Sequence, residues 1–337
     1  MIKRSLNLPL IFLLLILIAG CSTVKGPLGD REDATTWSSL YSNSNRWGST
    51  PDILQPPFEK IWSKKIRPFE SFKIYPREQL SVPVVAGGLL YIGSTNNKIY
   101  AFDLATGKVR WKYNAEAPVE STPTVGSGLL CFGSSKGYLQ CLHEKTGEEA
   151  WAFMTDSEVI SSPVITDNSV YFYSSSDRIF ALDQKSGKEI WSYRRSTFEM
   201  VRPRSRTSPA LTGDGEKILQ VFSDGVLVCL NAFTGKVLWE AKTFKPDIAS
   251  GHFRSTPAIS GDTVYVPGTD FKVQARLIDN GRVLKTYDSI KARAFVLAGK
   301  KGLVLASETE VALQSEKTGE LIWKKSPMED KNLISAI

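Results

Sequence analysis

The chain has 337 residues, of which 42% are hydrophobic and 23% charged, and its formal net charge is +7. These values are typical of a globular protein long enough to bury a large core, and they exclude wholesale disorder. The positive excess is mild, so nucleic acid is not an expected partner. Loss of Lys3 and Arg4 with the leader described next would lower the charge from +7 to +5.

The first twenty residues have the pattern of a secretory signal. Lys3 and Arg4 precede an unbroken apolar run over residues 10–18, which is shorter than the roughly 18 to 20 residues that a membrane span needs. The run closes on Ile18-Ala19-Gly20-Cys21, which resembles the lipobox of bacterial lipoproteins. That resemblance implies cleavage before Cys21 and lipidation of Cys21, whose acyl chains would hold the protein on a membrane.

The residues after the leader indicate a tether and a location. Residues 1–20 are therefore predicted to be a lipoprotein signal peptide, and the polar residues 21–36, with Gly and Pro, a flexible tether. In lipoproteins an Asp after the lipidated Cys retains the protein in the inner membrane, but here Ser22 follows. The resemblance thus implies an outer-membrane protein that faces the periplasm of a Gram-negative bacterium.

One phrase recurs along residues 37–337. "AFDLATGKVRW" (101–111) returns loosely as "ALDQKSGKEIW" (181–191), and alignment on its Gly gives six copies spaced 38 to 48 residues apart. Five copies carry Trp four residues after the Gly, and one carries Lys285 there. A period near 40 in β-rich units is typical of propellers and solenoids. The structural repeat residues are Gly107, Trp111, Gly147, Trp151, Gly187, Trp191, Gly235, Trp239, Gly281, Gly319 and Trp323.

Each unit contains four strand-like runs. In the first complete unit they cover residues 81–85, 89–93, 98–102 and 108–113, with Gly, Ser, Asn and Thr between them. The connections are hairpin-sized, so neighbouring strands should be antiparallel. In the last connection Asp103 can bond backbone groups two residues on, and Gly107 supplies a positive φ. The Trp then offers an apolar face that packs against the next sheet.

Two further runs are left over from the six complete units. Residues 58–65 have the pattern of a fourth strand without its unit, and residues 332–337 that of a first strand. Joined, they would start and finish a seventh blade and so remove the free edges of the ring. We therefore predict an all-β fold, a β-propeller of four-stranded antiparallel blades over residues 37–337. It should have seven blades with the last incomplete, or eight if the chain is a fragment.

The cysteines have the positions of packing residues. Cys141 and Cys229 stand where other units have Ala, which indicates small buried side chains. Cys131 and Cys141 lie across one hairpin and could pair in an oxidising compartment, but cross-strand disulfides are uncommon, so we expect two separate thiols. His143 stands where other units have the turn Asp and is expected to be a turn residue.

No catalytic constellation stands out in the sequence. It has no adjacent cysteines of the kind found under quinone cofactors, no C-x-x-C pair and only His143 and His252, too few for a zinc site. A nucleophile elbow is also missing. We therefore predict a protein that is not an enzyme and needs neither a cofactor nor a metal.

The linkers between units differ in length. From the Trp to the following first-strand Pro the interval is 12 residues in two linkers, but 21 after Trp62 and 18 after Trp191 and Trp239. All these linkers join a fourth strand to the next first strand, so the long ones should emerge on one face. They are rich in Lys and Arg, which either reflects ordinary solvated loops or marks a surface for an acidic partner. The candidate partner-binding residues are Arg194, Arg195, Arg202, Arg204, Arg206, Lys245, His252, Arg254 and Lys291.

From Trp37 onward the chain resembles the pyrroloquinoline-quinone-like (PQQ-like) repeat propellers. The resemblance rests on the phrase A-x-D-x-x-T-G-x-x-x-W and on a first-strand phrase S-[ST]-P, as in Ser121-Thr122-Pro123. These blades serve both quinoprotein enzymes and non-catalytic scaffolds. Among lipoproteins the chain resembles the BamB family, which implies docking onto the barrel subunit of the outer-membrane β-barrel assembly machinery and no catalysis.

Two features depart from the BamB pattern. Propellers of that family have eight blades, and their Leu-rich docking loop is replaced here by "MVRPRSRTSP" (200–209), in which Arg204 stands where the family has an arginine. The sequence predicts a lipid-anchored scaffold that binds envelope proteins. The alternatives are a quinone- and Ca²⁺-dependent oxidoreductase and a carbohydrate- or peptidoglycan-binding module.

Overall fold

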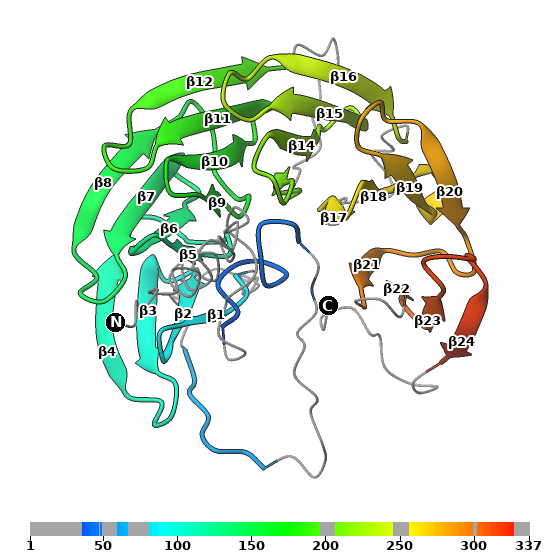
Figure 1. The fold of residues 1–337 in the computed structure, drawn as a ribbon. Coiled ribbons are helices and arrows are strands. Elements are labelled where there is room, and N and C mark those ends of the chain that lie inside the picture. The colour runs from blue at the N-terminus through cyan, green and yellow to red at the C-terminus, as the bar shows by residue number, and fades with distance from the viewer. Residues whose placement is uncertain are drawn as a thin grey trace, which may run out of the picture.

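A computed structural model describes residues 36–46, 48, 59–66, 81–195, 206–244, 256–298 and 302–326. In these residues the chain forms six four-stranded antiparallel sheets, arranged around an axis as the blades of a propeller (Figure 1). Within each blade the strands follow one another from the axis to the rim. The predicted all-β propeller is therefore confirmed.

The first three blades are nearly regular copies. Blade one contains β1 (Val84–Ala86), β2 (Leu89–Ser94), β3 (Lys98–Asp103) and β4 (Val109–Asn114). Blade two contains β5 (Thr124–Gly126), β6 (Leu129–Gly133), β7 (Tyr138–His143) and β8 (Glu149–Met154). Blade three contains β9 (Val164–Ile165), β10 (Ser169–Ser174), β11 (Arg178–Asp183) and β12 (Glu189–Arg194).

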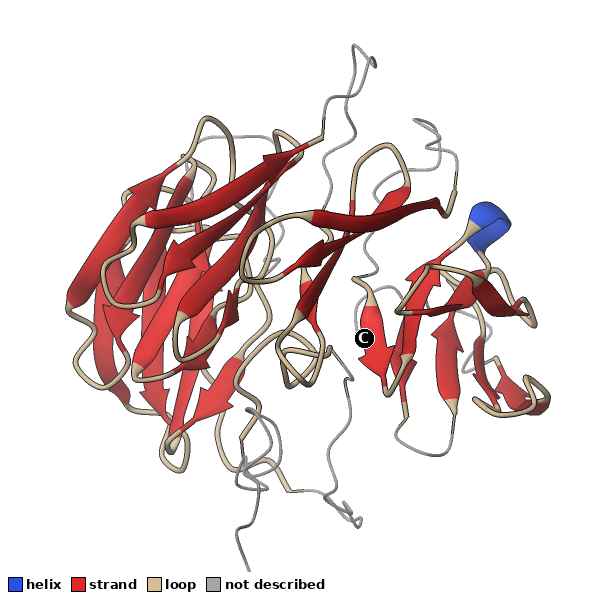
Figure 2. Ribbon diagram, turned by 45° about the horizontal axis from the view of Figure 1, so that its top comes forward, coloured by secondary structure: helices blue, strands red, loops and turns tan. Residues whose placement is uncertain are grey.

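The next three blades continue the ring, with one short 3-10 helix among the described residues (blue in Figure 2). Blade four contains β13 (Ala210–Leu211), β14 (Lys217–Val221), β15 (Val226–Asn231) and β16 (Val237–Lys242). Blade five contains β17 (Ala258–Ser260), β18 (Thr263–Pro267), η2 (Thr269–Phe271), β19 (Val273–Leu277) and β20 (Val283–Tyr287). Blade six contains β21 (Ala294–Leu297), β22 (Leu303–Ala306), β23 (Val311–Gln314) and β24 (Leu321–Lys325).

The turn of the repeated phrase folds the third strand onto the fourth. Gly107 has a φ of 66°, and its N–H donates to the Asp103 carbonyl over 2.8 Å. The Asp103 carboxylate accepts bonds from the Thr106 N–H (2.9 Å) and hydroxyl (2.8 Å), one residue beyond the predicted position. In blade two His143 holds the place of this Asp, as predicted, and its carbonyl accepts the Gly147 N–H over 2.8 Å.

A β-bulge follows each of these turns. In blade one Ala101 pairs with Trp111 and Phe102 with Val109, so Arg110 is an extra residue in the fourth strand. The same shift recurs in all six blades. Side chains alternate along a strand, so one extra residue places Trp111 and Val109 on opposite faces of the sheet. The bulge therefore turns the Trp towards the following blade.

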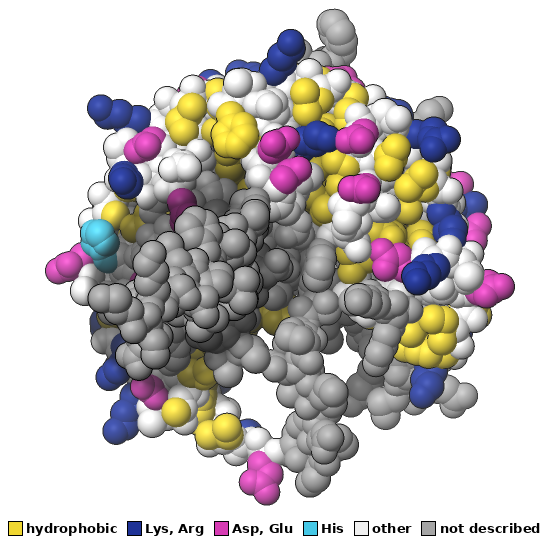
Figure 3. All heavy atoms as spheres, viewed as in Figure 1, with side chains coloured by type: hydrophobic (Ala, Val, Ile, Leu, Met, Phe, Trp, Pro, Cys, Tyr) yellow, Lys and Arg dark blue, Asp and Glu magenta, His cyan; other side chains and the backbone are white. Residues whose placement is uncertain are grey.

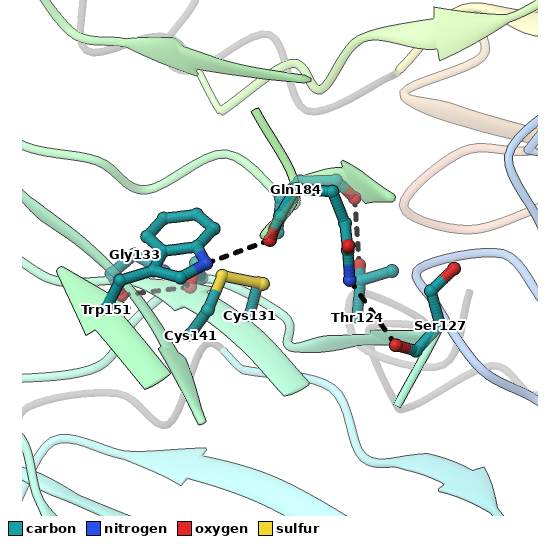
Figure 4. Close-up of a disulfide and its surroundings, with 9 residues drawn as sticks. Thr124, Ser127, Cys131, Gly133, Cys141, Trp151 and Gln184 are labelled. Carbon is teal, nitrogen blue, oxygen red and sulfur yellow. Dashed lines mark hydrogen bonds between the residues drawn. A yellow bond between two sulfur atoms is a disulfide. The ribbon is translucent and has the colours of Figure 1, made fainter. Parts of the chain in front are cut away.

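Five tryptophans of the described residues pack on the glycine turn of the next blade. Trp151 is 8% exposed, and a Cβ on Gly187 would lie 2.6 Å from its Cδ2 atom. The Trp151 Nε1–H donates to the Gln184 carbonyl over 2.9 Å (Figure 4). We call this contact the Trp–Gly latch. It joins Trp62–Gly107, Trp111–Gly147, Trp151–Gly187, Trp191–Gly235 and Trp239–Gly281, with N–H···O distances of 2.7 to 3.1 Å.

The latch changes at blade six. Lys285 takes the place of Trp between blades five and six, lies against Gly319 and donates to the Lys317 carbonyl over 2.5 Å. The hydroxyl of Tyr287 donates to the Glu316 carbonyl over 2.9 Å. Trp323, on the outer strand of blade six, is 38% exposed, more than the other repeat tryptophans in the described part of the chain.

Residues 59–66 run beside blade one without entering any of the six described sheets. Trp62 places its ring on Gly107 and 6.3 Å, centroid to centroid, from Phe102. This segment therefore occupies the position of a fourth strand that precedes blade one, as predicted. The predicted first strand of the same blade, residues 332–337, lies outside the described residues.

Cys131 and Cys141 form a disulfide, which corrects the expectation of two separate thiols (Figure 4). The two residues are direct partners in the β6–β7 pairing, with Cα atoms 4.1 Å apart, so their sulfur atoms meet across the hairpin. Cys229 has the corresponding position in blade four but faces Leu219, and it stays a buried thiol. Burial raises the pKa of this thiol to about 12.

The predicted signal peptide and the tether up to residue 35 lie outside the described residues. Within the described ranges, no helix has the length and apolar character needed to cross a bilayer.

Candidate partner-binding face

The linker face is the side of the propeller on which each fourth strand ends and the next blade begins. The strands of every blade are antiparallel and stand in the same order, so the six outer strands run in one direction (Figures 1 and 2). The connections that follow β4, β8, β12, β16 and β20 therefore all start on this face, as predicted.

Hydroxyl groups at the start of the first strands explain the S-[ST]-P phrase. Ser161 Oγ accepts the Tyr173 N–H over 3.0 Å and donates to the Tyr173 carbonyl over 2.6 Å, within blade three. The hydroxyl of the second residue of the phrase accepts a hydrogen bond from the neighbouring blade. The Ser162 N–H donates to Ser208 Oγ over 2.8 Å, and the Ser208 N–H donates to Thr256 Oγ1 over 3.1 Å. This belt fixes the starts of neighbouring first strands around the axis.

Arg206 and Glu120 form an ion pair across the mouth of the axis. Each stands directly before the first-strand phrase of its blade, Glu120 in blade two and Arg206 in blade four. Arg206 Nη2 lies 3.3 Å from Glu120 Oε2, and both side chains are largely buried. Two residues that stand directly before first-strand phrases are thus brought together, and Arg206 is a paired cation.

Arg195, at the end of the described part of blade three, is bound by two carboxylates of blade four. Its Nε lies 2.6 Å from Asp224 Oδ2 and its Nη1 lies 2.7 Å from Glu240 Oε2, and the side chain is 19% exposed. Tyr193 donates its hydroxyl to the other oxygen of Glu240 over 2.9 Å. Burial lowers the pKa of Arg195, but the two carboxylates outweigh burial and raise it above its ordinary value.

Two of the predicted partner-binding cations are exposed. Arg194 is 52% exposed and its Nη2 lies 3.7 Å from Asp156 Oδ2, while Lys291 is exposed before the first strand of blade six. The other predicted residues, Arg202, Arg204, Lys245, His252 and Arg254, lie outside the described residues, as does Cys21.

Carboxylates of the short linkers pair with some of the basic residues on this face. The short linkers after Trp111 and Trp151 contain Glu116, Glu120, Asp156 and Glu158, and a single basic residue, Lys112. Three of these acids pair with Lys136, Arg206 and Arg194. On the side of the propeller seen in Figure 3, described Lys and Arg side chains likewise lie among Asp and Glu, so mixed charge is not particular to the linker face. Counting acids in the short linkers, and not only bases in the long ones, would have shown that carboxylates also lie on this face.

The chain itself occupies the centre of the ring. Residues 36–46 and 48, which we call the axial strap, lie between the innermost strands (dark blue in Figure 1). The disulfide lies between the second and third strands of blade two, away from this centre. In the part of the chain that the structure describes, no three His, Cys, Asp or Glu side chains are grouped so that they could hold a metal ion.

A family profile described as outer membrane protein assembly factor BamB matches residues 58–151 and 125–325. The chain belongs to this BamB family. No curated protein is matched. Among solved structures, BamB from Moraxella catarrhalis is similar, with a TM-score of 0.61 and 19% identity over 76% of this chain and 78% of that one.

Alcohol-oxidising dehydrogenases of known structure share the fold of this BamB-family chain. A europium-containing methanol dehydrogenase has a TM-score of 0.61 and 11% identity, over 73% of this chain and 68% of that one. A quinohemoprotein alcohol dehydrogenase from Pseudomonas putida HK5 has a TM-score of 0.59 and 15% identity, over 88% of this chain and 53% of that one. At such identities the likeness concerns the fold alone.

Proposed function

We propose that this BamB-family propeller is a lipid-anchored, non-catalytic scaffold that binds envelope proteins and takes part in outer-membrane β-barrel assembly. The observation that carries the proposal is the family match, which extends over residues 58–325. The similar structure from Moraxella catarrhalis, itself a BamB, supports the same assignment.

The disulfide and the leader support the proposed compartment. Disulfides persist in oxidising compartments such as the periplasm, and the cross-strand bond between Cys131 and Cys141 fits a chain that is exported. The lipobox-like sequence that ends at Cys21 then supplies the anchor, and Ser22 favours the outer membrane.

The alternative function is a quinone- and Ca²⁺-dependent oxidoreductase, which the shared fold brings into consideration. Such an enzyme needs carboxylates grouped around a calcium ion and a base beside the quinone. The described residues do not fit these needs, since they hold no such acidic group and the axial strap fills the centre of the ring. We therefore derive no catalytic step for this protein.

The linker face is the proposed docking surface, and its cations divide into two kinds. Arg195 and Arg206 are held by carboxylates of the same chain and shape the ends of the linker between blades three and four. Arg194 and Lys291 are exposed, so they can meet an acidic partner. Such contacts between exposed charges weaken as the salt concentration rises.

Affinity purification of the tagged, full-length lipoprotein from chemically crosslinked envelopes tests the assembly role. We expect a component of the barrel-assembly machinery to be enriched with it, and enrichment of none would contradict the role. Charge reversal of Arg194, Arg204 and Lys291 together should weaken that capture about tenfold at low salt. The matched control is R110E, which reverses an exposed charge on the outer strand of blade one. Equal capture by both variants would remove the linker face from the proposal.

A further inference from the structure

The axial strap hydrogen-bonds to the inner edges of four first strands. An innermost strand has a free edge towards the axis, where its backbone groups need partners. The bonds are Trp37 N–H to Val85 O (2.8 Å), Val85 N–H to Trp37 O (2.8 Å), Val125 N–H to Ser38 O (2.7 Å), Leu211 N–H to Ser44 O (3.1 Å) and Ile259 N–H to Asn45 O (2.9 Å). In all four strands the bonded residue stands two positions after the first-strand Pro. One short segment thus supplies hydrogen-bond partners for edge backbone groups in blades one, two, four and five.

Arg46 links the strap to blade three and again to blade four. Its guanidinium donates from Nη2 to the Ser162 and Pro163 carbonyls (3.1 and 3.0 Å) and from Nε to the Pro209 carbonyl (3.2 Å). Its Nη1 donates to the Leu40 carbonyl of the strap itself over 3.0 Å. The residue is 1% exposed. Burial lowers its pKa to about 9, so the guanidinium is still charged at neutral pH.

The far end of the strap packs on blade six. A Cβ built on Gly48 would lie 3.0 Å from Val296 Cγ1 in β21, and Gly48 has a φ of 71°. The strap therefore contacts all six described blades, although it contains only about a dozen residues.

The conformation of the strap is unfavourable without the ring. Tyr41, Ser42 and Arg46 have φ values of 57°, 77° and 65°, in the left-handed region that residues with a Cβ disfavour. A buried guanidinium also loses its hydration and needs fixed carbonyl partners in exchange. Both features persist only because the contacts with the blades determine the path of the strap.

We propose that the axial strap closes the ring from the inside, with Arg46 as the residue that fixes it. Propellers ordinarily close when strands from both ends of the chain share one sheet. In the described residues blade six and residues 59–66 do not share a sheet, and the ring is open between them (Figure 1). The strap instead holds the six blades at their inner edges, where the bonds of one segment connect non-neighbouring blades.

Hydrogen–deuterium exchange on the full chain tests this closure. In R46Q the amides of Val125, Leu211 and Ile259, in three different blades, should exchange at least about tenfold faster than in the unaltered protein. Amides in the middle of β6 and β7 should keep their rates. The matched control is R110Q, an exposed arginine whose loss should change none of the three amides. Unchanged rates in a folded R46Q protein, or faster exchange at Leu211 alone, would overturn the proposal.

A second variant covers the case in which R46Q does not fold. G48A places a methyl group against Val296 at a left-handed position and should lift the end of the strap from blade six. We expect faster exchange at Ile259, whose acceptor Asn45 is the strap acceptor nearest to Gly48 in sequence, with Val125 less affected. A folded G48A protein in which Ile259 exchanges at the unaltered rate would count against the strap as a closing device.

Discussion

Gly187 meets two independent demands. Its φ is 67°, and any Cβ there would lie 2.6 Å from the Trp151 ring of the preceding blade. Gly128 offers a matched control, because its φ is 80° but a Cβ would meet nothing within 4 Å. G128A should therefore cost only the left-handed conformation, about 1 to 2 kcal/mol. G187A should lose about 1 to 3 kcal/mol more from overpacking, measured by urea unfolding. Equal losses would mean that the latch tolerates a methyl group.

The repeat tryptophans differ in burial, and their substitutions should differ accordingly. Trp151 is 8% exposed and bonded to Gln184, whereas Trp323 is 38% exposed on the outer strand of blade six. We expect W151A to lower the free energy of unfolding by about 3 to 5 kcal/mol. W323A should lower it by less than about 1 kcal/mol. Thermal and urea unfolding of both variants would check this order, and a larger loss for W323A would contradict it.

The turn aspartates should make the protein sensitive to acid. The side-chain bond from Ser186, followed by its backbone N–H, lowers the pKa of Asp183 below its ordinary value. A carboxyl with a lowered folded pKa stabilises the fold above the unfolded pKa, about 3.9. That contribution is lost as the pH falls through the folded pKa. D183N should therefore lose less stability than the unaltered protein between pH 5 and pH 2, as measured by urea midpoints. An identical pH profile would contradict this contribution.

Among the elements that the structure describes, the β6–β7 hairpin of blade two is the one with a covalent link. Cys131 and Cys141 close a loop with a sequence separation of 10. Replacing both with Ala should lower the free energy of unfolding by about 2 to 3 kcal/mol. Alkylation of the denatured, unreduced protein should modify Cys229 and spare this pair. Modification of all three without reductant would show that the bond does not form.

The elements of each blade were predictable because they depend on local patterns. The turn phrase fixes one hairpin through Asp103 and Gly107, and hydrophobic runs mark the strands within a few residues of their observed bounds. The bulge was not foreseen, since Arg110 breaks no pattern that a sequence displays. The disulfide was judged against the general rarity of such bonds, whereas the register places the two residues directly opposite each other.

Contacts between distant parts of the chain were beyond such patterns. The side chain of Asn45 donates to the Leu211 carbonyl, 166 residues away, and Arg206 pairs with Glu120 across 86 residues. Both depend on which positions the propeller fold brings to its centre. The candidate face could therefore be located by linker length, but the partners of its arginines could not.

For the molecule as a whole, the ring should be weakest where the repeat is broken. Lys285 replaces the latch Trp between blades five and six. In blade two the Glu144 carbonyl accepts hydrogen bonds from the Tyr91 hydroxyl (3.2 Å) and from the Trp111 Nε1–H (3.1 Å). One carbonyl of this turn can therefore accept from a Tyr and a Trp at the same time. K285W should therefore add a latch beside Tyr287 and raise the free energy of unfolding by about 0.5 to 2 kcal/mol. A lower thermal midpoint would mean that the junction between blades five and six has no room for the indole side chain.

The latch also makes the two ends of the propeller unequal in their tolerance of change. Within a described sheet, a latch Trp stands four residues after the Gly of its own blade. A different spacing would change which face of the sheet the bulge gives to the Trp side chain. The turn between the third and fourth strands therefore has a fixed length. Unit lengths nevertheless range from 38 to 48 residues. The largest differences fall in the linkers after Trp62, Trp191 and Trp239. Insertions that form new binding loops can therefore be accepted in the linkers, while the turns at the opposite end preserve the contacts between blades.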